Sequence, residues 1–154
     1  MEVAVDTEGI AHVSATLDLP SDPRTVWGIL TDYEHWPSLW SGGMTVVAIR
    51  SEPDGVVTDL LVPRIWLPGT LRLVIVTQTG TTDRIETRLV DGDFDRFWRV
   101  WVLIPIQEGR RTRARLQMDV RPKAWIPAWA FSYLLRQQLQ DHLERLRLAV
   151  ERRG

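Results

Sequence analysis

Aromatic side chains are the residues of this 154-residue chain that most clearly suggest a chemistry. Eight of them are tryptophans. Aromatic rings bind flat apolar molecules through a large contact area and through edge or face contacts. The same rings could instead fill a protein core, and the sequence alone leaves both interpretations open. Three groups stand out, namely Trp36 with Trp40, Trp98 with Trp101, and Trp125 with Trp129 and Tyr133.

Motifs for metal binding or nucleophilic catalysis are missing from the sequence. The three histidines, His12, His35 and His142, are widely separated, and the short motifs of zinc proteases, phosphate-binding loops and serine hydrolases are absent. The chain has no cysteine, which excludes disulfides, thiolate metal sites and cysteine nucleophiles. A D-x-D-x-D spacing begins at Asp91, but Arg96 stands where a calcium loop needs glycine. We therefore predict no metal site and no cofactor.

Acid–base catalysis would require a titratable group inside a pocket. The sequence offers several such groups without ranking them above ordinary structural residues. They are Tyr33, His35, Asp59, Tyr133 and His142.

Composition indicates one ordinary globular domain, with 44% hydrophobic residues, 25% charged residues and a net charge of −1. This charge argues against nucleic acid as a partner. Several arginines occupy alternating positions of a predicted strand, and we interpret them as the solvated outer face of a sheet. They are Arg111, Arg113, Arg115 and Arg121, with Arg84 and Arg88 beside them.

The N-terminus lacks the features of a secretory signal, and the apolar runs fall short of the ~20 residues that span a bilayer. We predict a cytoplasmic protein without a transmembrane segment.

Alternating apolar and polar residues predict a series of strands separated by turns. Asp22 followed by Pro23 is typical of a helix start, and Pro37 interrupts the short helical region that follows. A second helical period begins at Pro127 and runs to about residue 153, a length of about 40 Å. The predicted strands cover residues 12–19, 44–51, 56–66, 71–79, 82–90, 94–104 and 111–120. The helix carries one apolar stripe of Phe131, Leu135, Leu139, Leu143, Leu146 and Val150.

This order predicts an α+β domain over residues 1–154, with its core in residues 10–152. We expect a curved antiparallel sheet of six to seven strands around the long C-terminal helix, with two short helices after the first strand. A sheet curled around a single helix can leave a cavity. An empty cavity of ~300 Å³ would destabilise the fold by about 7 kcal/mol, so a protein that keeps one is expected to bind something there.

The chain resembles the START-like or SRPBCC superfamily, in its polyketide cyclase/dehydrase and coenzyme-Q-binding branch. Three stretches carry the resemblance. The first is residues 22–37, a helical region that ends with Asp32, Tyr33 and Pro37. The second is the hairpin turn of residues 89–94 together with Trp101 on the next strand. The third is the Leu–x–x–Leu pattern of Leu143 and Leu146 near the end of the last helix. The resemblance covers about residues 10–152 and implies the helix-grip (START/Bet v 1-like) fold. Members mostly bind apolar molecules between sheet and helix; some cyclise or dehydrate polyketides, and others carry lipids, quinones or sterols.

One question of orientation remains in the strand over residues 94–104. Aligning Trp101 with the inward tryptophan of the family turns Arg99, Trp101 and Leu103 toward the cavity; the opposite orientation would expose Arg99. An inward Arg99 would be a partner for a ligand carbonyl or carboxylate, because a buried guanidinium demands acceptors. The same orientation leaves an apolar strip on the outer face, made of Trp98, Val100, Val102 and Ile104.

Taken with the resemblance, these observations predict binding or transport of a hydrophobic small molecule such as a lipid, quinone, isoprenoid or aromatic polyketide. The alternatives are a cyclase/dehydrase-type enzyme using the same cavity, and a protein–protein interaction module using the outer apolar strip. Transient membrane contact through residues 126–135 and a monomeric or homodimeric state also stay open. The candidate ligand-binding residues are Trp36, Trp40, Met44, Arg99, Trp101, Leu103, Leu116, Met118, Trp129 and Tyr133.

Overall fold

The computed structural model describes residues 1–40, 42–64, 67–81 and 83–153. Within them the chain forms eight strands, two α-helices and one short 3₁₀ helix. The strands are β1 (Glu2–Val5), β2 (Ala11–Leu19), β3 (Thr45–Glu52), β4 (Gly55–Pro63), β5 (Thr70–Thr81), β6 (Arg84–Gly92), β7 (Phe94–Ile106) and β8 (Arg111–Pro122). The helices are α1 (Pro23–Leu30), η1 (Tyr33–Leu39, the 3₁₀ helix) and α2 (Ala128–Arg153).

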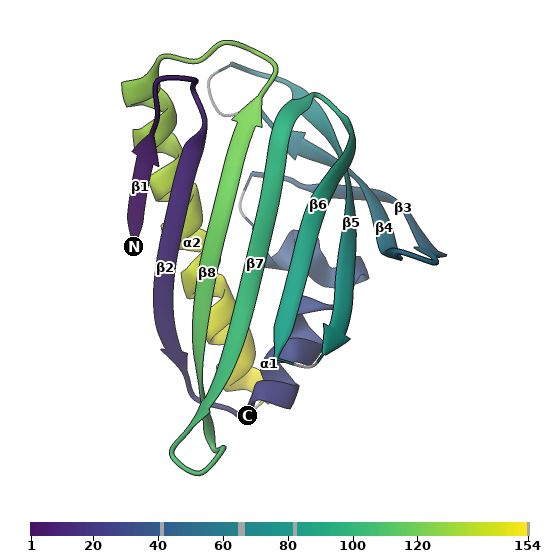
Figure 1. Ribbon diagram of the computed structural model, residues 1–154, viewed down its shortest axis with the longest axis vertical. Coiled ribbons are helices and arrows are strands. Elements are labelled where there is room, and N and C mark those ends of the chain that lie inside the picture. Colours follow the sequence, from purple (N-terminus) through teal and green to yellow (C-terminus); the bar gives the residue numbers. More distant parts are fainter. Residues whose placement is uncertain (41, 65–66, 82, 154) are drawn as a thin grey trace.

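The strands form one antiparallel sheet in the order β1-β2-β8-β7-β6-β5-β4-β3. Figure 1 shows α2 running behind this sheet along its strands, which is the predicted α+β helix-grip architecture. The sheet has one strand more than the predicted six to seven, because the first residues of the chain pair with β2, as in Val3 opposite Val13. Trp66 and Thr82, at the predicted ends of two strands, lie outside the described residues.

The short helices form where the sequence predicts them. The Asp22 side chain accepts a hydrogen bond from the Thr25 backbone N–H at 2.9 Å and so caps α1, and Pro23 occupies the first helical turn. The next turn buries Trp36, whose indole N–H donates to the Leu30 carbonyl at 3.1 Å. This bond holds η1 beside α1 and points the Trp36 ring into the interior.

Strand β7 has the orientation that the family resemblance favours. Phe97, Arg99 and Trp101 are buried and lie opposite Val120, Met118 and Leu116 of β8. These β8 residues alternate strictly with exposed or half-buried ones. The inner face of β7 is therefore the one that carries Arg99.

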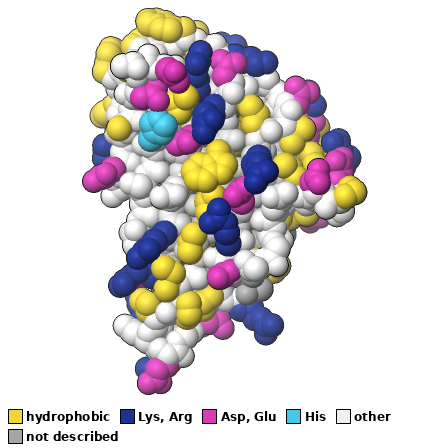
Figure 2. Space-filling view, in the orientation of Figure 1, with side chains coloured by type: hydrophobic (Ala, Val, Ile, Leu, Met, Phe, Trp, Pro, Cys, Tyr) yellow, Lys and Arg dark blue, Asp and Glu magenta, His cyan; other side chains and the backbone are white. Residues whose placement is uncertain are grey.

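The outer face of the sheet mixes apolar and charged side chains. Val100 is buried there, while Trp98, Val102 and Ile104 are half-buried. Their cross-strand neighbours among the described residues are polar or charged; Val102, for example, pairs with Arg84 on one side and Arg115 on the other. Figure 2 shows hydrophobic side chains on this face interspersed with charged ones. Several arginines of this face form ion pairs, namely Arg84 and Arg88 with Glu86, Arg96 with Asp119, Arg113 with Asp18 and Arg121 with Asp95.

Candidate functional site

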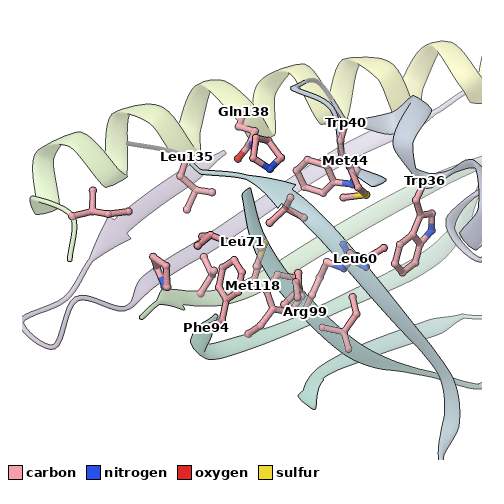
Figure 3. A pocket seen from close by; sticks show the side chains of 18 residues that line it. Trp36, Trp40, Met44, Leu60, Leu71, Phe94, Arg99, Met118, Leu135 and Gln138 are labelled. Carbon is pink, nitrogen blue, oxygen red and sulfur yellow. The ribbon is translucent and has the colours of Figure 1, made fainter. Parts of the chain in front are cut away.

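A cavity of about 80 Å³ lies between the inner face of the sheet and α2. Its sheet side is formed by β4, β5, the first half of β7 and the last residues of β8, with Leu60, Leu73 and Met118 among the buried lining residues. Leu135 and Gln138 of α2 form the helix side. Figure 3 shows these two side chains reaching down from α2, with Arg99 on the opposite, sheet side of the cavity.

The cavity opens where its lining residues are only half-buried. These include Trp40 and Met44 beside the start of β3, Val62 near the end of β4, and Ile126 just before α2. The deeper walls, such as Leu60 and Ile75, are fully buried and apolar. The space is therefore an apolar cavity whose described lining includes two polar side chains, Arg99 on the sheet wall and Gln138 on the helix wall.

At about 80 Å³ the cavity is smaller than the ~300 Å³ considered from the sequence. An empty space of this size destabilises a fold by about 2 kcal/mol, a quantity that a domain can tolerate. It accommodates a single ring or a segment of an alkyl chain. A larger ligand would have to displace side chains, and Met44 and Met118 in the lining are unbranched and adapt readily.

Arg99 is the most unusual residue of the cavity. It is only 8% exposed, and its Nε–H is buried without a hydrogen-bond partner. Its guanidinium carbon lies 5.4 Å from the centre of the Trp36 ring and 5.9 Å from that of Phe97. Burial lowers the pKa of Arg99 to about 10, so the side chain still carries its charge at neutral pH.

The two aromatic contacts compensate only part of the cost of burying this charge. A cation over an aromatic ring gains about 1–2 kcal/mol, whereas removing an ion from water costs several kcal/mol. None of the ion pairs among residues 1–40, 42–64, 67–81 and 83–153 includes Arg99. The guanidinium is therefore a charge that the rest of the described chain leaves without an anion.

A stacked pair of rings forms the cavity wall next to α2. Trp40 lines the cavity, and the His142 imidazole lies against its ring. The His142 Nδ1–H donates to the Leu39 carbonyl at 2.6 Å. Burial lowers the pKa of His142 to about 3, with the charge of Arg99 acting in the same direction, so the imidazole is neutral at pH 7.

Five of the ten candidate ligand-binding residues line the cavity. The other five do not. Trp101, Leu103 and Leu116 are buried farther along β7 and β8, toward the half of the sheet against which α1 packs. Packing by α1 leaves no opening there in the described part of the chain, so these three side chains belong to the solid core. The five lining residues are Trp36, Trp40, Met44, Arg99 and Met118.

The remaining two candidates lie on the surface. Trp129 is 72% exposed and Tyr133 is 58% exposed. Leu135 and Leu139 mark the buried face of α2, and Tyr133 lies two residues, about 200°, away from Leu135 on the helix. This rotation turns Tyr133 out of the cavity.

Several lining residues were not predicted from the sequence. Leu60 of β4 lies opposite Leu73 of β5, and Leu71 of β5 lies opposite Val62 of β4, a pairing that exists only once the two strands have come together. Gln138 could have been predicted as a lining residue, because it interrupts the apolar side of α2 three residues after Leu135. A polar residue beside an apolar helix stripe indicates a wall that faces something other than the packed core.

The acid–base candidates do not converge on the cavity. His35 is exposed and bonds to Asp32 at 2.9 Å, Asp59 pairs with Arg72 at 3.1 Å, and Tyr133 bonds to Gln137. Tyr33 is half-buried beside Trp36, and burial raises its pKa. His142 is buried behind Trp40 and bonded to the backbone. Within the described residues, Arg99 is the one titratable side chain that lines the cavity.

Metal binding and membrane crossing find no support in the described part of the chain. No group of three or more histidine and acidic side chains there could hold a metal ion. None of the helices formed by those residues combines the length and apolar character that crossing a membrane requires.

The sequence also matches a known protein family. Residues 19–147 match the family described as polyketide cyclase / dehydrase and lipid transport. The chain belongs to this family. No curated protein matches the sequence.

Solved structures similar to this family member share its fold. A START superfamily protein from Mycobacterium smegmatis has a TM-score of 0.72 and 20% sequence identity, covering 93% of this chain and 99% of that one. A protein from Thermus thermophilus has a TM-score of 0.68 and 23% identity, over 92% and 95% of the two chains. The Zhui aromatase/cyclase from Streptomyces sp. R1128 has a TM-score of 0.64 and 15% identity, over 92% and 91%. At these identities the similarity concerns the fold alone.

Proposed function

We propose that this protein binds a hydrophobic small molecule, such as a lipid, quinone, isoprenoid or aromatic polyketide, between its sheet and α2. The observation that supports the proposal is the cavity wall, which is apolar except for Arg99 and Gln138. Such walls, with few polar groups at defined positions, are typical of sites for small apolar ligands. The family, whose description includes lipid transport, supports the same assignment.

Binding is favoured over cyclisation by the composition of the cavity wall. Cyclising a polyketide requires a group that takes or gives a proton beside the substrate. No histidine, tyrosine or carboxylate of the described residues lines the cavity. Arg99, with a pKa of about 10, would polarise a carbonyl rather than move a proton at neutral pH.

The exposed aromatic side chains near the cavity support brief contact with a membrane during loading. Trp125 is 81% exposed and borders a shallow depression together with Leu67. This depression shares Leu71 and Ile126 with the cavity wall. Tryptophan side chains favour the region between lipid head groups and acyl chains. A membrane touching this side would bring an apolar ligand close to the cavity opening.

Native mass spectrometry of the purified protein tests the proposal, followed by organic extraction of any bound molecule. We expect a 1:1 non-covalent complex that is lost on unfolding, and uptake of one decan-1-ol per stripped protein. A folded protein with no bound molecule and no decan-1-ol uptake would overturn the proposal.

A matched pair of variants locates the binding site in this experiment. Val62→Trp fills the cavity near its opening, whereas Val47→Trp adds the same side chain to an exposed position of β3. We expect Val62→Trp to abolish uptake and Val47→Trp to retain it. Equal uptake by the two variants would place the bound molecule elsewhere.

A further inference from the structure

The charge on Arg99 distinguishes this cavity from a simple apolar one. The guanidinium sits on the sheet wall, and its Nε–H faces no acceptor in the described chain. A buried polar hydrogen without a partner is rare in folded proteins, and a buried full charge without one is rarer. The Arg99 Nε–H is thus free to donate a hydrogen bond to an acceptor that the described chain does not supply.

The groups around Arg99 are neutral. Trp36 and Phe97 present aromatic rings to the guanidinium, and His142 on α2 is uncharged at pH 7. On the sheet, the direct cross-strand neighbours of Arg99 are Met118 of β8 and Thr87 of β6, and the Thr87 hydroxyl bonds to that of Thr77 at 3.1 Å. Hydroxyls and the edges of aromatic rings can lie against a bound anion without repelling it, whereas a carboxylate beside Arg99 would already have neutralised the charge.

The position of Arg99 also orients a ligand. Half-buried apolar residues, Trp40, Met44 and Ile126, form the opening, and Arg99 is buried on the sheet side. In Figure 3 Arg99 lies near Trp36 and Leu60, away from Gln138 on the helix side. A molecule with one charged end would place that end on the sheet wall and leave its apolar part toward the opening.

We infer that the ligand is an apolar molecule with a single anionic oxygen group, such as a carboxylate, and that Arg99 binds this group inside the cavity. The inference rests on the proposed function and specifies its ligand class. A guanidinium suits this task because its N–H groups match the two oxygens of a carboxylate.

Isothermal titration calorimetry with three probes of equal chain length tests the inference. The probes are decanoate, decan-1-ol and decyltrimethylammonium, used below the concentrations at which they aggregate. We expect wild-type protein to bind decanoate at least 10-fold more tightly than decan-1-ol, and to bind the cation most weakly. Equal or stronger binding of decan-1-ol would overturn the inference while leaving the proposed function intact. Failure of all three probes to bind would count against the proposed function itself.

Two variants test whether Arg99 causes the preference for decanoate over decan-1-ol. Arg99→Met removes the charge but keeps an apolar side chain of similar length, and Arg88→Met removes an exposed arginine from the outer face of β6. We expect decanoate affinity in Arg99→Met to fall at least 10-fold more than decan-1-ol affinity, and the remaining decan-1-ol binding also reports an intact cavity. Arg88→Met should keep the wild-type preference. An unchanged preference in Arg99→Met, or its loss in Arg88→Met, would assign the effect to surface charge and overturn the inference.

Discussion

The imidazole of His142 stacks on the indole of Trp40, with ring centroids 3.7 Å apart and ring planes 7° apart. Trp40 lines the cavity, and His142 comes from the middle of α2. The same imidazole bonds to the carbonyl of Leu39, the residue before Trp40. The stack and the hydrogen bond together fix the end of η1 to α2, and so hold one wall of the cavity in place.

This arrangement predicts a pH-dependent stability that His142 controls. Its pKa falls from 6.5 to about 3 on folding, because burial disfavours the charged imidazole. Between these values the unfolded state binds one proton more than the folded state, so stability decreases as the pH falls below 6.5. The expected loss is about 2 kcal/mol at pH 5 relative to pH 8.

Urea unfolding at pH 5, 6, 7 and 8 measures this effect, with His142→Gln as the test variant and His12→Gln as the control. We expect His142→Gln to flatten the dependence below pH 6.5. His12 bonds to Asp6 and Asp119, which raise its pKa, so its contribution is present below pH 6.5 and is lost as the pH rises above that value. His12→Gln should therefore leave the lower range unchanged. A wild-type slope in His142→Gln would contradict the assignment.

Replacing Arg99 should stabilise the ligand-free protein. Arg99→Met removes a buried charge that has no anionic partner and retains the apolar contacts of the side chain, with an expected gain of about 1–3 kcal/mol in the free energy of unfolding. Arg88→Met, at an exposed ion pair with Glu86, should change stability by less than about 1 kcal/mol. Chemical unfolding at pH 7 compares them. A loss of stability in Arg99→Met would mean that the guanidinium has a stabilising partner.

Replacing each of two equally buried leucines should distinguish a residue that lines the cavity from one that belongs to the packed core. Leu60 lines the cavity, whereas Leu103 packs outside it, and both are 1% exposed. Replacing either with alanine should cost about 2–5 kcal/mol, because each deletes buried apolar volume. Only Leu60→Ala should change decan-1-ol affinity, measured by calorimetry. A similar change in Leu103→Ala would show that binding does not depend on this cavity.

Gly92 should tolerate substitution much less well than Gly109. Gly92 has φ of +113°, and a Cβ atom there would lie 2.3 Å from the Arg72 carbonyl oxygen. Gly109 has φ of +81° with open space around it. Gly109→Ala should cost about 1 kcal/mol from backbone strain alone, and Gly92→Ala clearly more. Thermal unfolding compares the two variants, and equal losses would mean that the backbone at Gly92 relaxes easily.

The fold could be predicted because its main signals are local. Strand β2 alternates and the apolar stripe of α2 repeats at helical spacing, so each element carries its own evidence. Strand β1 escaped prediction because Glu2–Val5 is short and gains its burial only by pairing with β2. The face of β7 could not be read from β7 itself, whose residues 97–104 are apolar except for Arg99. Pairing with the strictly alternating β8 decides it.

The cavity was harder to predict, since it depends on how far each covering element extends. Trp101 and Arg99 lie on the same face of β7, yet only Arg99 lines the cavity, since α1 packs against the other half of the sheet. No pattern within one strand contains that information. The outward position of Tyr133, in contrast, follows from its spacing to Leu135 and could have been read from the helical period.

Methyl NMR of the protein, labelled at leucine and methionine and titrated with decan-1-ol, shows directly whether an apolar molecule binds in the cavity between the sheet and α2. We expect shifts that saturate at one equivalent and concentrate on Met44, Leu60, Leu71 and Met118, with Leu103 and Leu116 little affected. No saturable shifts, or shifts centred on Leu103 and Leu116, would contradict binding at this site.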